Sequence, residues 1–123
     1  MVLPPTPAQL GFRMPAEWEP HAATWLAWPH QEDDWPGKFD AIPWVYAEIV
    51  RLLHRSELVR ILVNDAEHED KARRVLSRVD LDWDSLEFQR IPTDRAWVRD
   101  YGPLFVTRDD TIALTDWQFN AWA

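Results

Sequence analysis

Acidic, basic and aromatic side chains are mixed over Thr93–Pro103, which has the sequence Thr-Asp-Arg-Ala-Trp-Val-Arg-Asp-Tyr-Gly-Pro. The segment lies between two apolar stretches typical of strands. Neither a linker nor a strand core has a need for four charges beside two large aromatic rings. Loops of this composition usually bind a ligand through charge pairing and ring contacts. We therefore interpret the segment as a candidate binding loop, the alternative being a surface loop whose arginines and aspartates pair with one another.

The spacing of apolar residues predicts the elements that position this loop. A short buried strand is expected at Ala22–Trp28, ended by Pro29. A helix is expected where apolar residues recur three and four positions apart, at Ile42, Val45, Tyr46, Ile49, Val50 and Leu53. The continuous branched run Leu58–Val63 indicates an inner strand, and Leu86–Ile91 alternates with period two, as half-buried strands do.

A second helix is predicted between these two strands. Asn64 and Glu67 form a candidate N-cap pair. The apolar stripe of this helix comprises Ala72, Val75, Leu76 and Val79. Opposite charges stand four residues apart in three pairs, which are Glu67/Lys71, Glu69/Arg73 and Asp70/Arg74. They predict that the outer face of this helix is exposed to solvent.

The last apolar stretches, Leu104–Val106 and Ile112–Leu114, are expected to form a hairpin through Arg108–Asp110. Strands that alternate with helices indicate an α/β fold with a partly parallel sheet.

Composition narrows the class of protein. The 123 residues are the size of one domain, with 46% hydrophobic residues and a net charge of −8. We expect no membrane span, and the acidic charge disfavours nucleic acid and anionic lipid and favours a cationic ligand. The absence of cysteine excludes a disulfide or a thiol nucleophile within this chain, and we expect a cytoplasmic setting.

Three further blocks surround the Trp97 loop in a fixed order. They are Gly11–Pro20, Thr24–Pro29 and Asp116–Trp122. Together they resemble the amino-terminal part of the agmatine deiminases and of the related Porphyromonas-type peptidylarginine deiminases, in the guanidine-modifying (pentein) superfamily. The resemblance extends from about Gly11 to Trp122 without a large insertion.

The resemblance implies a five-bladed α/β propeller built from ββαβ units. This chain would supply the first blade and the start of the second. On that basis we expect residues 1–10 to be an extended, Pro-rich leader and residues 11–123 to be a truncated amino-terminal portion of a deiminase domain. Unpaired blade edges would then favour self-association or a complementing chain.

The resemblance also implies the chemistry, which is hydrolysis of a guanidinium to a ureido group and ammonia through a thiol adduct, without metal or cofactor. In the agmatine case the product is N-carbamoylputrescine. Asp100 matches the family's first guanidinium-binding carboxylate, and we assign it as a catalytic and substrate-binding residue. Trp97 matches the aromatic wall of the substrate channel, and we expect Arg99 to hold the loop or a neighbouring carboxylate. Asp94-Arg95 departs from the Asn-Asp pair often found in agmatine deiminases and adds a positive charge, which keeps a peptidylarginine deiminase-like activity open.

The chain lacks the family's cysteine nucleophile, and none of its four histidines matches the catalytic position. We therefore expect the isolated chain to be inactive, and we expect His54, near a helix end, to be structural.

Two other interpretations remain open. One is a metal site built from His21, His30, Glu32, Asp33 and Asp34, although their spacing matches no familiar ligand motif. The other is a non-catalytic binding module, since the chain has nine tryptophans and three of them, Trp35, Trp44 and Trp83, lie outside the matching blocks.

Overall fold

The computed structural model describes residues 4–120, which divide into two compact units. The first, the sheet unit, is His21–Val98. The second, the hairpin unit, comprises residues 4–20 and 99–120. Within residues 4–120, none of the helices has the length and hydrophobicity that a bilayer crossing requires. The expectations for Met1–Leu3 and for Trp122 lie outside the described residues.

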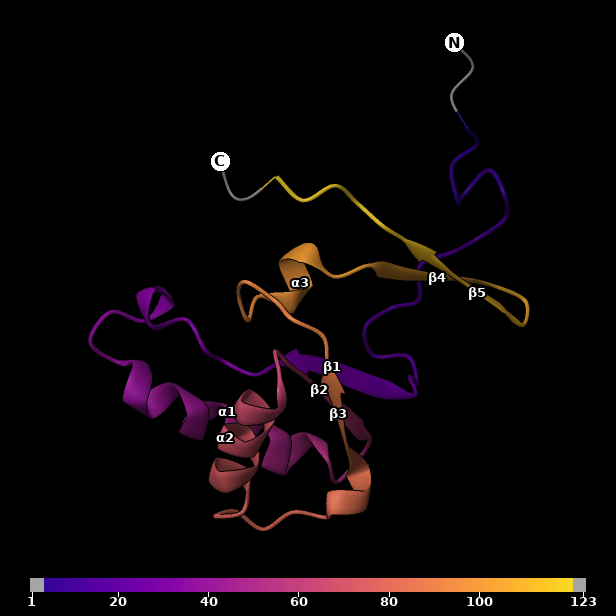
Figure 1. Ribbon diagram of the computed structural model, residues 1–123. Coiled ribbons are helices and arrows are strands. Elements are labelled where there is room, and N and C mark those ends of the chain that lie inside the picture. Colours follow the sequence, from indigo (N-terminus) through magenta and orange to yellow (C-terminus); the bar gives the residue numbers. More distant parts are fainter. Residues whose placement is uncertain (1–3, 121–123) are drawn as a thin grey trace. The chain divides into compact units, whose positions relative to one another are not determined.

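The sheet unit contains a three-stranded parallel sheet and two helices (Figure 1). The strands are β1 (Ala23–Ala27), β2 (Leu58–Val63) and β3 (Leu86–Arg90), and β2 lies in the middle. The helices are α1 (Ile42–Leu53) and α2 (Ala66–Leu76). Four of the five predicted elements are confirmed to within one residue at each end, and so is the α/β class with a parallel sheet. The second helix is confirmed in kind, but it ends at Leu76, before the predicted Val79.

Three short 3₁₀ turns complete this unit. They are η1 (Glu32–Asp34), η2 (Phe39–Ala41) and η3 (Trp83–Ser85).

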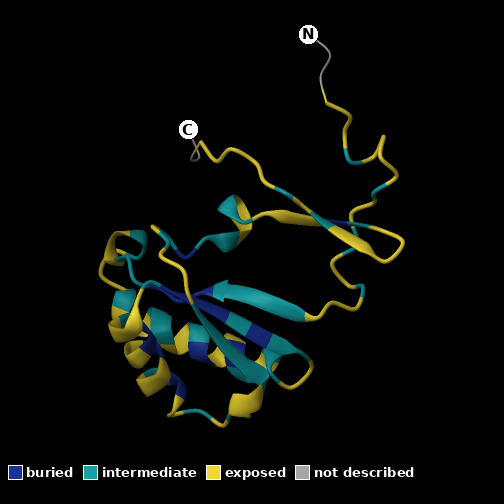
Figure 2. Cartoon of the chain, turned by 45° about the vertical axis from the view of Figure 1, so that its right-hand side comes forward, coloured by how far each residue is buried: buried dark blue, intermediate teal, exposed yellow. Residues whose placement is uncertain are grey.

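The apolar run of β2 is explained by burial on both faces of the sheet. Val59, Ile61 and Val63 point to the helices and join the main core, which also contains Trp28, Ala47, Val50, Ala72 and Leu76. Leu62 points to the opposite face, where it packs with Ala27 and Ala96. Figure 2 shows the buried residues concentrated on the central strand and on the helix surfaces next to it. Leu58 and Arg60, on the same face as Leu62, are only half-buried, so β2 is covered on both faces toward its carboxyl end.

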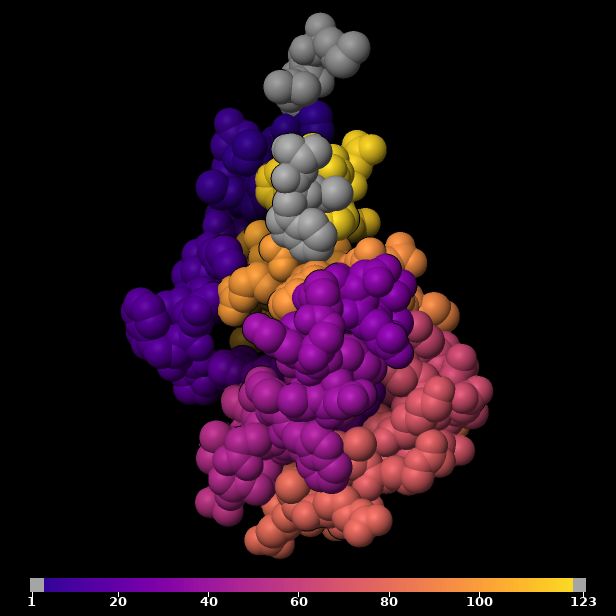
Figure 3. All heavy atoms as spheres, turned by 90° about the vertical axis from the view of Figure 1, so that its left-hand side faces the viewer, coloured from indigo at the N-terminus to yellow at the C-terminus, as the bar shows by residue number. Residues whose placement is uncertain are grey.

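Both helices cover the same face of the sheet. Right-handed crossovers from β1 to β2 and from β2 to β3 require this arrangement when the strand order is sequential. The two helices lie next to each other on the surface in Figure 3. Pro43 stands in the first turn of α1, where a missing N–H costs nothing. His54 closes that helix by placing its backbone N and its Nδ1 3.0 and 3.2 Å from the Val50 carbonyl oxygen, the structural role we expected.

The start and end of α2 differ from the sequence expectation. Asp65, not Asn64, is the N-cap, and its Oδ1 accepts the backbone N–H of His68 at 2.8 Å. Both residue types are good caps, so adjacent positions compete and sequence alone does not decide between them. The helix ends at Leu76, and Val79 packs against the core from the segment that follows.

The expected solvated face of α2 is wrong at one position. Glu67 and Lys71 do form an exposed ion pair at 2.7 Å. Glu69, however, is only 9% exposed and pairs with Arg73 on its own helix and with Arg90 on β3. Because Arg90 is distant in sequence, the helical charge spacing could not reveal this link between helix and strand.

The hairpin unit is built on β4 (Leu104–Arg108) and β5 (Thr111–Thr115), which pair antiparallel as predicted. Asp109 in the turn has a φ of 50°, a left-handed conformation that aspartate tolerates better than most residues. Arg13 extends this small sheet, exchanging two backbone hydrogen bonds with Thr107 at 2.8 and 2.9 Å.

Two segments contain turns or helix that were not expected from the sequence. Residues 7–11 form successive turns, in which the Leu10 N–H lies 3.1 Å from the carbonyl oxygens of Thr6 and Pro7. The loop that we interpreted as the binding segment contains the four-residue helix α3 (Val98–Tyr101). So short a helix has no apolar periodicity, and for that reason it could not be predicted from the residue pattern.

Candidate functional site

Asp100 lies on α3 and lines an open hollow of about 400 Å³ within the hairpin unit. The side chain is exposed, so its carboxylate is accessible from solvent. The hollow is lined by two segments of that unit, with Arg99, Asp100, Tyr101, Gly102 and Leu104 from one and Trp117, Gln118, Phe119 and Asn120 from the other. Gly102 and Pro103 separate α3 from β4 and so bring the chain directly from the carboxylate into the hairpin.

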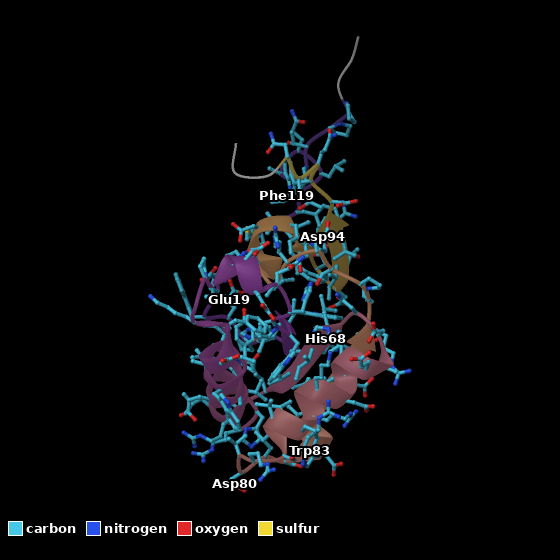
Figure 4. The ribbon with its side chains drawn as sticks, turned by 60° about the vertical axis from the view of Figure 1, so that its left-hand side comes forward. Glu19, His68, Asp80, Trp83, Asp94 and Phe119 are labelled. Atoms are coloured by element: carbon cyan, nitrogen blue, oxygen red, sulfur yellow. The ribbon has the colours of Figure 1, made fainter. Side chains whose placement is uncertain are left out.

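Aromatic rings make up much of the wall of this hollow. The rings of Tyr101 and Phe119 meet edge to face with their centroids 6.4 Å apart, and Figure 4 labels Phe119. The indole N–H of Trp117 donates to Thr115 Oγ1 at 3.0 Å, which orients a ring that is 67% exposed. A carboxylate beside exposed aromatic rings can hold a cation through hydrogen bonds and ring contacts.

These aromatic residues were not singled out by the sequence analysis as site residues. The available signal was the block Asp116–Trp122, which we used for the family resemblance but not for the site. The β4–β5 hairpin lies between Asp100 and this block in the sequence. Its fold therefore determines which aromatic rings of the block lie beside Asp100.

Two arginines of the hairpin unit, Arg99 and Arg108, each contact a residue of the amino-terminal segment. Arg99 pairs with Glu17 at 2.5 Å, the carboxylate-holding role expected for it. Arg108 donates to the Leu10 carbonyl oxygen at 2.7 Å, and its guanidinium lies 4.7 Å from the Phe12 ring centre. The positive charge of Arg99 is therefore locally balanced, which lowers its repulsion of a cationic ligand.

Trp97 belongs to the sheet unit, where it is half-buried in a row of aromatic rings. Its ring centroid lies 5.1 Å from that of Trp35, and Trp35 lies 6.0 Å from Phe39. The adjacent Ala96 is buried against Ala27 and Leu62 on the sheet. The backbone at Trp97 is thus held by the sheet, and its ring forms one end of an aromatic wall.

Arg95 is ion-paired in the sheet unit. Its Nε lies 3.5 Å from Oδ1 of Asp34, whose side chain is only 12% exposed. The positive charge that distinguishes this loop from the common Asn-Asp pair is therefore compensated by a nearby carboxylate.

Three of the five residues of the metal hypothesis contact other side chains. His21 pairs with Glu57 at 2.6 Å, Asp34 pairs with Arg95, and the ring of His30 meets that of His68. Among residues 4–120, His, Asp and Glu side chains form no group of three or more that could hold a metal ion.

The three tryptophans of the binding-module hypothesis lie on different elements of the sheet unit. Trp35 packs on Trp97, Trp44 is exposed on α1, and Trp83 lies in η3 with the guanidinium of Arg73 5.7 Å from its ring centre. They do not belong to one stacking surface on a single element.

Comparison with known proteins decides the family. The model of the Porphyromonas-type peptidyl-arginine deiminases matches residues 13–123. The chain belongs to this family. An agmatine deiminase of Pseudomonas aeruginosa strain LESB58 is 38% identical over 118 residues, covering 95% of this chain and 30% of that relative. The resemblance inferred from Gly11–Trp122 is thereby confirmed.

Solved structures agree with the assignment. An X-ray structure provisionally named as an agmatine deiminase is 33% identical with a TM-score of 0.79, over 95% of this chain and 32% of the other. The agmatine deiminase of C. jejuni has a TM-score of 0.72 over 90% of this chain and 32% of the other, and its 20% identity supports the fold alone. The chain spans about 30% of the length of the curated agmatine deiminases that it matches.

Proposed function

We propose that this chain supplies the guanidinium-binding part of an agmatine deiminase, with Asp100 as the carboxylate that holds the guanidinium. The observation that carries the proposal is the position of Asp100. In a chain of a guanidine-modifying family, this residue lines an aromatic hollow and is accessible to solvent. A guanidinium is a flat fork of N–H donors, and a carboxylate can accept two of them at once.

Trp97 is proposed as an aromatic wall for the same substrate. Its ring is supported by Trp35 and only partly buried, so one part of its surface remains available. An indole attracts a delocalised cation through its ring face and also packs well against methylene groups, which agmatine carries between its two charged ends.

The proposed reaction is hydrolysis of agmatine to N-carbamoylputrescine and ammonia. It requires a nucleophile to attack the guanidinium carbon and an acid/base group to protonate the departing nitrogen. The chain contains no cysteine, so the proposal places the thiol outside these 123 residues. Residues 11–123 would then form the first ββαβ blade and the start of the second in a pentein propeller.

An activity on peptidyl arginine is the second candidate, because the matching family model is named for it. The ion pair of Arg95 with Asp34 bears on the choice. A compensated Arg95 does not oppose the second positive charge of agmatine, and this supports agmatine as the first candidate.

The test is a titration of the ¹⁵N-labelled chain with agmatine and, separately, with putrescine, followed by NMR. Putrescine keeps an aliphatic diamine but lacks the guanidinium. Agmatine should shift the amides of Arg99–Tyr101 and the indole N–H of Trp97, and putrescine should shift them far less. An N-acetyl arginine amide that shifts these signals more strongly than agmatine would favour the peptidyl-arginine alternative. Equal shifts with putrescine, or ammonia release from agmatine by the chain alone, would contradict the proposal.

A further inference from the structure

Asn64 connects the carboxyl end of the central strand to the loop that carries Trp97. It follows β2 directly, and its side-chain Oδ1 accepts the backbone N–H of Thr93 at 2.9 Å. Thr93 begins the stretch that leads through Ala96, buried on the sheet, to Trp97. All these residues belong to the sheet unit, so this hydrogen bond fixes the loop to the strand within one compact body.

His68 in turn holds Asn64. The backbone N–H of Asn64 donates to Nδ1 of His68 at 3.0 Å, while the backbone N–H of His68 donates to the Asp65 cap. Figure 4 labels His68, which lies at the amino-terminal end of α2. The arrangement differs from a capping box, because the imidazole accepts the backbone N–H of Asn64, the residue before the cap, and not that of the cap Asp65 itself. Because Nδ1 is the acceptor, the neutral ring carries its proton on Nε2.

We propose that Asn64 is a positioning residue for the Trp97 loop, and that His68 makes this positioning depend on pH. The proposal deepens the proposed function, because the consequence for substrate rests on Trp97 being the wall of the guanidinium site. A protonated imidazole has N–H groups on both nitrogens, so it cannot accept from Asn64. Acidification then removes the hydrogen bond from the Asn64 backbone N–H to the His68 ring. The Asn64 side chain is then less firmly positioned to accept the backbone N–H of Thr93.

The surroundings of His68 set the direction of this dependence. Burial of the ring and the neighbouring His30, whose ring centroid is 5.2 Å away, lower the pKa of His68 below its ordinary 6.5. Lys71 acts in the same direction, while the Pro29 carbonyl and Asp65 act in the opposite one. Glu32 and Glu67 also line the hollow beside the ring and belong to the same electrostatic environment.

The lowered pKa of His68 determines whether the loop is held more firmly at neutral or at acidic pH. The native state disfavours the charged ring, so the neutral, accepting form is fully present above about 6.5, the unfolded value. Its stabilising contribution is lost as the pH falls through the lowered native pKa. The loop should therefore be held firmly at neutral pH and loosened in acid.

The first experiment measures amide hydrogen exchange of residues 91–98 in the chain and in two variants of Asn64. Asn64→Ala removes the acceptor of the Thr93 N–H and should speed exchange there by about three- to tenfold, the effect of losing one net hydrogen bond. Asn64→Asp keeps an acceptor oxygen at the same place and should restore the slow exchange. An unchanged Thr93 rate in Asn64→Ala would overturn the positioning role.

The second experiment tests the histidine and does not depend on Asn64→Ala being folded. The Thr93 rate, corrected for the intrinsic pH dependence of exchange, is followed from pH 8 to pH 5 in the native sequence and in His68→Gln. Glutamine keeps an acceptor but does not titrate, so the protection should fall in acid in the native sequence alone. His54→Gln is the matched control, because His54 caps α1 on its own Val50 carbonyl. It should behave like the native sequence.

The proposed role of His68 would be wrong if protection of the Thr93 amide did not change with pH in the native sequence. It would also be wrong if that protection still changed with pH in His68→Gln. Both readouts are taken without substrate. A failure of Asp100 to bind a guanidinium would therefore leave them unchanged, and the two proposals fail separately.

Discussion

The sheet unit buries its apolar side chains, whereas the hairpin unit leaves most of its own in contact with solvent. The core of the sheet unit contains residues with no exposed surface, among them Ala47, Val50, Val59 and Ile61. In the hairpin unit Val106 is the buried strand residue, while Ile112 is 68% exposed. Two regions of one short chain therefore differ in what holds them together. Burial stabilises the first, and the second relies more on backbone pairing between β4, β5 and Arg13.

This contrast matters for the candidate site. Trp97 stands on the well-buried unit, whose loop is tied to the strand by Asn64. Asp100 stands on the other, beside exposed aromatic rings. We infer that the aromatic wall is preorganised by the sheet, while the carboxylate lies in the less stable part of the chain.

The largest expected effect is on the core. Ile61→Ala should lower the free energy of unfolding by about 2–5 kcal/mol, because it removes a buried side chain and leaves a cavity. The same substitution at the exposed Ile112 should change it by about 0.5 kcal/mol or less. Urea unfolding followed by circular dichroism measures both, and similar losses for the two variants would break the comparison.

A smaller effect is expected at the buried carboxylate of α2. Burial alone would raise the pKa of Glu69, but hydrogen bonds from Arg73 and Arg90 outweigh it and hold the pKa below 4.5. Glu69→Gln should cost about 1–2 kcal/mol, because both arginines lose a charged acceptor. The stabilisation from Glu69 is present above pH 4.5 and is lost as the pH falls through its lowered native pKa.

Glu67→Gln is the matched control on the same helix. The pair of Glu67 with Lys71 is exposed, so this change should cost about 0.5 kcal/mol or less. If the two glutamates behaved alike, Glu69 would be one more residue of a solvated face, as its spacing first indicated.

The smallest effect is expected at the ion pair between Arg13 and Glu19, which lies in the amino-terminal segment of the hairpin unit. Arg13 donates two hydrogen bonds to Glu19, at 2.8 and 2.9 Å, and these lower the pKa of Glu19 to about 2. Arg13→Ala should return that pKa toward 4.5, which carboxylate NMR would detect. The contribution to stability is present above pH 4.5 and lost as the pH falls toward 2. If Glu19 in the native sequence titrated near pH 4.5, the ion pair with Arg13 would not be formed in solution.

Most of the sheet unit could be predicted from sequence because its signals are local. The three-four spacing of α1 and the branched run of β2 each lie within one element. What sequence missed depends on partners far along the chain. Arg90 forms an ion pair with the buried Glu69, and Trp35 packs on Trp97. Asp65 and Asn64 are equally good cap candidates by residue type. In the structure Asp65 accepts the backbone N–H of His68, while the side chain of Asn64 accepts that of the distant Thr93.

The site was predicted differently. Asp100 and Trp97 came from a family resemblance and not from periodicity, and their roles stay predictions. The rings beside Asp100 could not be predicted, because Tyr101 and Phe119 meet only after the hairpin has turned the chain back.

The most direct measurement compares agmatine binding to Asp100→Asn and to Asp110→Asn by NMR titration of the chain. Both variants remove one negative charge from the hairpin unit, but Asp110 lies in the β4–β5 turn and does not line the hollow. We predict that Asp100→Asn raises the dissociation constant by about tenfold or more, since charged hydrogen bonds are lost, while Asp110→Asn leaves it nearly unchanged. Equal weakening in the two variants would mean that agmatine responds to net charge alone, and the assignment of Asp100 would be wrong.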